Sequence, residues 1–167
     1  MNTKAPSRTA KWLAYGTLAF GSAVVISTTS QPTLAANACR DIDSVKESAD
    51  LSKNTEMGGH VTQHVLGMDP PKGTSQNEKT LFKDGEKFRR IWNKYNGIPN
   101  PKYCAGNQNI QQVFRIDGFV DALSCREADD KGRCTAYDSY AADTIAVAFV
   151  KNGTKWILNT AYPVPMK

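Results

Sequence analysis

Histidine and cysteine are scarce in this chain, although they are the residues that most often bind metals or move protons. The 167 residues include two histidines and four cysteines. No two cysteines form a C-x-x-C pair, and there is no third histidine to complete a ligand set. Val61 stands where the H-E-x-x-H motif of zinc peptidases has its glutamate. A zinc site is therefore disfavoured, and we expect neither a metal nor another cofactor.

A strong excess of charge is also lacking outside the N-terminal segment. The whole chain has 21 basic and 16 acidic residues, a net charge of +5. Without Lys4, Arg8 and Lys11, 18 basic residues remain against 16 acidic ones, so the net charge falls to +2. An excess of that size does not by itself mark a nucleic-acid-binding protein. No repeat or low-complexity tract follows, and the length predicts one domain.

The N-terminal segment has the order of a secretory signal peptide. A basic start leads into an uncharged, mostly apolar run over residues 12–27, and small residues follow up to Ala38. We expect a signal peptide at 1–36, cleaved after Ala36 or Ala38, and a mature domain at 37–167. The alternative is an uncleaved anchor, because a span needs about 20 apolar residues. Cys39 lacks the preceding pattern of a lipoprotein. We expect export to the periplasm or the exterior, with no stable membrane association after cleavage.

All four cysteines lie in the mature part. An even number in an exported chain predicts two disulfides, with three possible pairings. Cys125 and Cys134 flank a polar stretch with a turn at Lys131-Gly132, which favours a local bridge. Cys39 and Cys104 would then join the mature N-terminus to the middle of the chain. The alternative is that the thiols are free and buried.

The periodicity of apolar residues predicts an α+β domain, with N-terminal helices followed by a twisted antiparallel sheet and stapled by disulfides. Residues 40–53 and 79–95 are helix-compatible, the second helix beginning near Asp84. A loop separates them at 69–78. Strands are expected at 112–117, 145–150 and 155–160, the last two joined by the Asn-Gly turn of residues 151–154. Trp92 and Trp156 are expected in the core, and residues 137–140 in a surface loop that is either an ordinary turn or a base contact.

Both histidines lie in one short stretch, GGHVTQHV, from Gly58 to Val65. The H-x-x-x-H spacing would place both imidazoles on one face of a helix. Three interpretations are open: a metal clip, an acid–base device, or ordinary polar packing. The two glycines would give the chain a tight entry into that helix. An acid–base role needs further residues to hold a substrate.

Those further residues are suggested by a family resemblance at both ends of the domain. GGHVTQHV resembles the segment that opens the ribonuclease-A-like toxin domains of bacterial contact-dependent growth inhibition proteins. The stretch KWILNTAYP, which ends at Pro163, resembles their closing strand, and TLFKD before the amphipathic helix is similar to their central helix. The resemblance covers residues 57–163 and implies a ribonuclease-A-like fold.

The resemblance also implies a set of site residues. His64 matches the family's catalytic histidine, and Thr160 and Tyr162 match the threonine and tyrosine of the closing strand, where alternate side chains face the same way. His60 is the candidate for a second proton carrier. The family's arginine is replaced here by Ser75, and Lys72 or Lys79 would have to supply the positive charge for substrate binding.

Such a site implies a metal-independent endoribonuclease, either secreted or acting as an antibacterial toxin. Its substrate would be RNA, because the 2′-hydroxyl is the nucleophile and DNA lacks it. The product would be a 2′,3′-cyclic phosphate. We expect a monomer, with a cognate immunity protein as a possible partner. The alternative, favoured by the missing arginine, is an exported binding module that keeps the same fold without catalysis.

Overall fold

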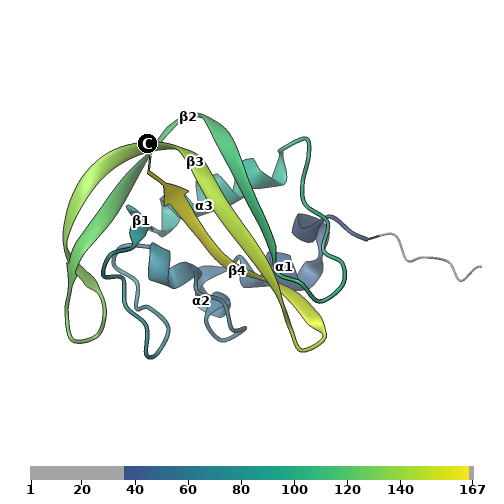
Figure 1. Ribbon diagram of the computed structural model, residues 1–167, viewed down its shortest axis with the longest axis horizontal. Helices are drawn as coiled ribbons and strands as arrows, with labels where there is room; N and C mark the ends of the chain where they lie inside the picture. Colours follow the sequence, from purple (N-terminus) through teal and green to yellow (C-terminus); the bar gives the residue numbers. More distant parts are fainter. Residues whose placement is uncertain (1–35, 166–167) are drawn as a thin grey trace, which may run out of the picture. The chain divides into compact units, whose positions relative to one another are not determined.

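Four antiparallel strands, in the order β1-β2-β3-β4, organise the domain (Figure 1). The computed structural model describes residues 36–165, so the predicted signal peptide falls outside the described residues except for Ala36. The strands are β1 (Thr80–Phe82), β2 (Ile110–Ala128), β3 (Cys134–Asn152) and β4 (Lys155–Val164). The α-helices are α1 (Asp43–Ser48), α2 (Leu51–Asn54) and α3 (Gly85–Asn96), and two short 3₁₀ helices are η1 (Cys39–Asp41) and η2 (Val61–His64). The predicted α+β class is confirmed.

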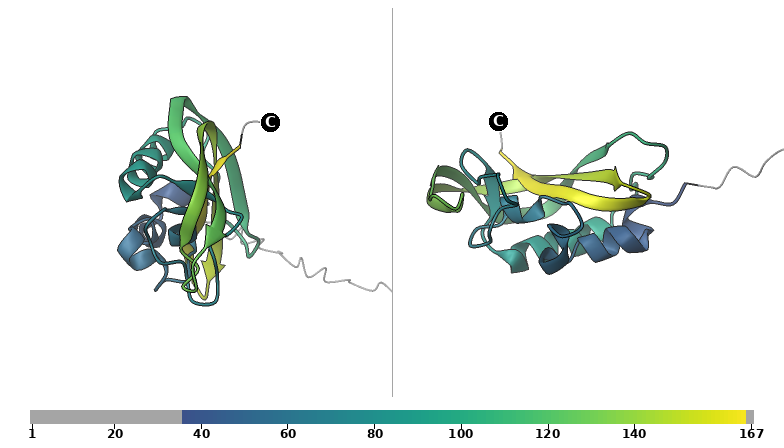
Figure 2. Two further views of the ribbon diagram at one scale, coloured as in Figure 1. Left: turned by 90° about the vertical axis from the view of Figure 1, so that its left-hand side faces the viewer. Right: turned by 90° about the horizontal axis from the view of Figure 1, so that it is seen from below.

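The three α-helices form a layer on one face of the sheet (Figure 2). Helix α3 begins where the sequence predicts, since the side chain of its N-cap, Asp84, accepts a hydrogen bond from the backbone N–H of Lys87. The helix predicted over residues 40–53 is instead divided into η1, α1 and α2. Extended backbone at Ile42 and Asp50 interrupts it, and the carboxylate of Asp50 caps α2 at the N–H of Ser52.

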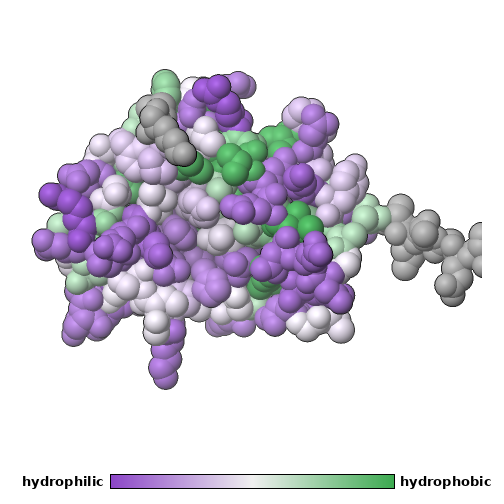
Figure 3. Space-filling view, in the orientation of Figure 1, coloured by the Kyte–Doolittle hydropathy of each residue, from purple (hydrophilic) through white to green (hydrophobic). Residues whose placement is uncertain are grey.

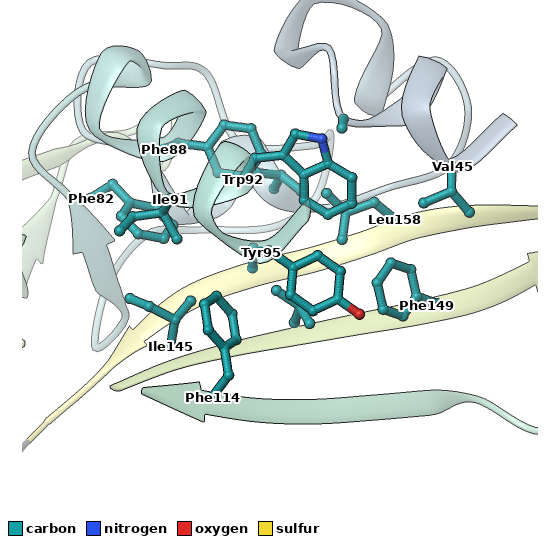
Figure 4. Packing of buried hydrophobic residues seen from close by; sticks show 14 of the residues in the cluster. Val45, Phe82, Phe88, Ile91, Trp92, Tyr95, Phe114, Ile145, Phe149 and Leu158 are labelled. Carbon is teal, nitrogen blue, oxygen red and sulfur yellow. The ribbon is translucent and has the colours of Figure 1, made fainter. Parts of the chain in front are cut away.

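The main hydrophobic core lies between this helical layer and the sheet (Figure 4). Helix α3 contributes four side chains at helical spacing, namely Phe88, Ile91, Trp92 and Tyr95. They meet strand residues that include Phe114, Ile145, Phe149 and Leu158. Trp92 and Trp156 are both buried, as predicted. Tyr95 donates its hydroxyl hydrogen bond to the side-chain oxygen of Gln112, and burial raises the pKa of this phenol to about 12.

Strands β2 and β3 form a hairpin much longer than the sequence indicates. Each has 19 residues, and the register shifts between Arg115 and Val120, where Gly118 has a φ of 81°. The prediction of a loop at residues 137–140 is wrong, because these residues lie in β3 and pair with β2. Residues 137–139 are exposed and Tyr140 is only partly buried, so this part of the strand has the composition of a loop. The predicted turn between β3 and β4 is confirmed.

Two disulfides are present, as predicted, and of the three possible pairings the structure has Cys39–Cys104 and Cys125–Cys134, with no described cysteine free. Two disulfides in a domain of this size are typical of a protein that folds in an oxidising compartment outside the cytoplasm. Among the helices of residues 36–165, none is long and apolar enough to cross a membrane. Figure 3 shows the face seen in Figure 1, where polar side chains separate several small hydrophobic patches.

Candidate functional site

His64 lies beside β1, where the next residue, Val65, forms a parallel bridge with Phe82. Its Nδ1 atom is 2.8 Å from the backbone oxygen of Thr80. Because a carbonyl oxygen can only accept, Nδ1 carries the hydrogen, and the neutral ring keeps its lone pair on Nε2. The ring also stacks on that of Tyr162, with centroids 5.0 Å apart and an angle of 29° between the planes. Two strands therefore fix the position and the tautomer of one imidazole.

The surroundings of His64 favour its neutral form. Burial of the ring lowers its pKa below that of an ordinary histidine, and the positive charges of Lys79 and His60 lower it further. The hydrogen bond to Thr80 raises the pKa of His64, but by less than burial lowers it. At neutral pH the ring is thus a base with a free Nε2 atom.

A bulge in β4 places Thr160 and Tyr162 opposite the core. Trp156 and Leu158 point into the core at even-numbered positions, but beyond the bulge the core position is the odd-numbered Ala161. The register shift lies between the pairs Phe149–Leu158 and Ala148–Thr160, so Asn159 is the extra residue. Such a bulge turns the following side chains to the other face of the sheet. Without it, Thr160 and Tyr162 would point into the core.

The hydroxyls of Thr160 and Tyr162 differ in their bonding. The Oγ1 atom of Thr160 is buried and is the only buried side-chain nitrogen or oxygen within residues 36–165 that has no hydrogen-bond partner. The Oη atom of Tyr162 is 3.5 Å from Nε2 of Gln111 on β2. A buried hydroxyl without a partner is costly, so Thr160 Oγ1 carries an unsatisfied hydrogen-bonding capacity beside Tyr162.

His60 is held by its backbone and not by its side chain. It is the N-cap of η2, and its N–H donates to the backbone oxygen of Asn159 in the bulge. The prediction that His60 and His64 share one face of a helix is wrong, because η2 is a 3₁₀ helix. With three residues per turn, residues i and i+3 eclipse each other, and residues four apart are displaced around the axis. The two rings are nevertheless close enough for the charge of His60 to lower the pKa of His64.

The two glycines before His60 are needed for different structural reasons. Gly58 has a φ of +91°, a conformation that side chains rarely adopt. A Cβ atom on Gly59 would lie only 2.4 Å from the side-chain nitrogen of Asn54. Gly59 therefore leaves room for the buried amide of Asn54, whose oxygen accepts the N–H of Val61 and whose nitrogen donates to Ser48 and Leu158.

Sequence reasoning missed two buried amides that hold the histidine segment, Asn54 and Gln76. Both have no exposed surface. Asn54 binds the N-terminal end of η2, and Gln76 donates to the backbone oxygens of Thr62 and Val65 at its C-terminal end. They satisfy groups that every helix leaves without internal partners. The sequence does not indicate that these amides are buried, because both lie in polar stretches. Gly59, which packs against Asn54 in the structure, was the one sign of a close approach.

The two lysines proposed for substrate binding are not equivalent. Lys79 is near enough to lower the pKa of His64, whereas Lys72 is exposed in the loop before β1. Ser75, at the position of the family's arginine, uses its backbone oxygen to accept from Gln63 and its hydroxyl to accept from the N–H of Asn77. The structure thus brings Tyr162 and Lys79 close to His64, with Thr160 two residues from Tyr162 on β4. Lys72 is not among the charged groups that shift the pKa of His64.

Two further features bear on ligand binding. A cavity of about 630 Å³ lies between the α1–α2 region and α3, lined by residues such as Asp50, Arg89 and Trp92, and it contains none of the predicted site residues. The geometry around His64 is the better guide to chemistry, because the cavity contains no histidine and its Ser52 hydroxyl is hydrogen-bonded to Asp50 at the cap of α2. Within the described part of the chain, no group of three or more histidine, cysteine, aspartate or glutamate residues is arranged to hold a metal ion.

Comparison of the chain with protein-family models, with curated proteins and with solved structures finds no match.

Proposed function

We propose that this protein is a metal-independent endoribonuclease with a ribonuclease-A-like fold, exported from the cell that makes it. The observation that carries the proposal is the stacking of His64 on Tyr162, two residues from the buried, unpartnered hydroxyl of Thr160. Intramolecular cleavage of RNA needs a general base for the 2′-hydroxyl and donors that stabilise the charge on the phosphate. His64 can act as the base, and the hydroxyls of Thr160 and Tyr162 can act as donors.

His64 is the general base of this reaction. Its Nδ1–H is engaged with Thr80, so Nε2 is left to take the proton from the 2′-hydroxyl of the ribose. The oxygen then attacks the adjacent phosphorus, the bond to the 5′-oxygen of the next nucleotide breaks, and a 2′,3′-cyclic phosphate results. The lowered pKa of His64 keeps the ring unprotonated at neutral pH, which a base needs.

Thr160, Tyr162 and Lys79 stabilise the charge that grows on the phosphate. The free hydroxyl of Thr160 donates to one phosphate oxygen, and that of Tyr162 donates to the same group from the same side of β4. The ammonium of Lys79 supplies the positive charge. Donors of this kind contribute on the order of 3 kcal/mol each when they are fixed before the reaction begins. His60 is the candidate acid for the leaving 5′-oxygen.

The alternative is an exported binding module without catalysis. It is favoured by Ser75, which offers a backbone oxygen to Gln63 where the resemblance calls for an arginine. Lysine does not replace the two-pronged geometry with which arginine binds phosphate. An immunity protein remains a possible partner if the enzyme reaches a cytoplasm.

Cleavage of yeast tRNA by the oxidised protein, residues 37–167, in the presence of EDTA tests the proposal. We expect activity that survives the chelator and is lost in His64→Ala. A dinucleotide with a 2′-deoxyribose at the scissile position should remain intact, and mass spectrometry should find a cyclic phosphate on the ribose product.

His60→Ala is the matched comparison, because it removes the other imidazole from the same segment. A loss smaller than that of His64→Ala assigns the base to His64. An intact, folded wild-type protein that leaves tRNA uncut at micromolar concentration contradicts the proposal and favours the binding module. Loss of cleavage with EDTA alone contradicts the metal-independent mechanism.

A further inference from the structure

We propose that Gln76 is a positioning residue which ties His64 to the disulfide-closed tip of the β2–β3 hairpin, so that the Cys125–Cys134 bridge keeps the site assembled. The inference rests on the proposed function for its effect on catalysis. Its effect on the environment of His64 is independent of any activity.

The side chain of Gln76 joins three parts of the chain. Its nitrogen lies 3.1 Å from the oxygen of Thr62, 2.8 Å from that of Val65 and 3.2 Å from that of Met68. Two of these carbonyls flank His64 in sequence. Its oxygen accepts the N–H of Cys134 at 2.9 Å. One fully buried amide therefore links the histidine segment to the second cysteine of the bridge.

Backbone hydrogen bonds reinforce the link to the hairpin tip. The N–H of Gln76 donates to the oxygen of Gly132, the N–H of Glu78 to that of Cys125, and the N–H of Cys125 to that of Lys79. Gly132 has a φ of +79°, and a Cβ atom there would lie 2.6 Å from the oxygen of Thr74. The tip thus packs directly against the loop that leads to Lys79 and Thr80.

A small apolar cluster joins the same two regions. Leu81, Leu123 and Cys125 are buried together, apart from the main core, and Leu66 and Cys134 pack against them. Leu66 follows His64 by two residues, and its N–H donates to the oxygen of Phe82. This cluster is small, and it is held by the bridge and by the β1–β2 pairing that sets Leu81 opposite Leu123.

Loss of this support would free His64 from its buried position. The groups around the ring are Tyr162, which stacks on it, and Lys79 and His60, whose charges reach it. Burial is the largest influence on its pKa, so a loosened segment should move the pKa of His64 upward, toward that of an ordinary histidine. A misplaced base should also cleave RNA more slowly, by on the order of a hundredfold for a shift near 1 Å.

Proton NMR can follow this directly, because the chain has only two histidines and His60→Asn assigns them. We expect Gln76→Ala to raise the pKa of His64 and to lower kcat/KM. Gln112→Ala is the matched control. Gln112 also makes three side-chain hydrogen bonds, to Asn100, Lys102 and Tyr95, but none of them involves the segment from Gly58 to Val65. Its loss should leave the His64 titration unchanged.

The two disulfides provide a second test that remains usable if Gln76→Ala fails to fold. The double variant Cys125→Ser/Cys134→Ser opens a loop of sequence separation 9, and Cys39→Ser/Cys104→Ser one of separation 65. The longer loop should cost more overall stability. We nevertheless expect the pKa of His64 to rise only when the shorter loop is opened.

The outcomes separate this inference from the proposed function. An unchanged His64 titration in folded Gln76→Ala overturns the inference, as does an equal rise in both disulfide variants, which would reflect general loosening. A wild-type protein that cuts no RNA contradicts the proposed function alone, because the titration still decides whether Gln76 positions His64.

Discussion

The region around α3 and the segment around His64 are stabilised in different ways. Around α3, aromatic side chains such as Trp92, Tyr95 and Phe149 pack against one another, and apolar burial supplies the stability. Around His64, Val61 and Val65 also reach the core, but the buried amides of Asn54 and Gln76 hold the backbone. Directional hydrogen bonds therefore add to apolar packing in fixing the backbone on either side of His64.

Truncation in the aromatic core should have the largest effect on stability and little on the site. Phe88 is 1% exposed, and Phe88→Ala should reduce the free energy of unfolding by about 3–5 kcal/mol, because it leaves a cavity. Urea denaturation measures this. The NMR titration of His64 should stay as in the wild type, and a clear change in it would mean that the two regions are not separately stabilised.

Removal of the amide of Asn54 should have a smaller effect on stability but a larger one on the site. Asn54→Ala leaves the N–H of Val61 and the oxygens of Ser48 and Leu158 without their partner, which should cost about 2–3 kcal/mol. RNA cleavage should fall more than in Phe88→Ala. Asn93→Ala, on the exposed face of α3, is the control and should change neither quantity.

The pH dependence of stability should report the burial of His64. Its pKa is lower in the folded than in the unfolded protein, so the unfolded protein takes up a proton first as the pH falls. The stabilisation is complete above the unfolded value, about 6.5, and is lost as the pH falls from there through the folded value. Denaturation at several pH values measures the free energy of unfolding. In His64→Asn this free energy should lose the pH dependence described here, and in His60→Asn it should keep it. Equal curves for both variants would contradict it.

Replacement of Thr160 should have the smallest effect on stability of these variants. Its effect on RNA cleavage should nevertheless be large. Thr160→Val keeps the shape but removes a buried hydroxyl that has no partner, so the protein should be unchanged or more stable by up to about 1 kcal/mol. RNA cleavage should fall by on the order of a hundredfold if the hydroxyl binds phosphate. Thr144→Val, on the adjacent strand β3, is the control for activity. Full activity in Thr160→Val would remove Thr160 from the site.

The sequence predicts the parts of this fold that depend on local pattern. The start of α3 near Asp84 and the Asn-Gly turn follow from capping and turn chemistry. The presence of two disulfides follows from the even number of cysteines, and the spacing favours the local bridge Cys125–Cys134. Residues 137–140 were misjudged because a strand with an exposed polar face has the composition of a loop. The helix at residues 40–53 was predicted as one because periodicity does not reveal the extended residues that interrupt it.

At the candidate site, the amino acids alone set the available chemistry: two imidazoles, a threonine and a tyrosine in a strand, and lysines nearby. Which of these groups meet depends on the folded chain, because a bulge at Asn159 changes the face that Thr160 and Tyr162 occupy, and two buried amides fix the loop that carries His64. Those contacts join residues as far apart in sequence as Asn54 and Leu158. Local propensity cannot encode such contacts, since each partner alone is an ordinary polar or apolar residue.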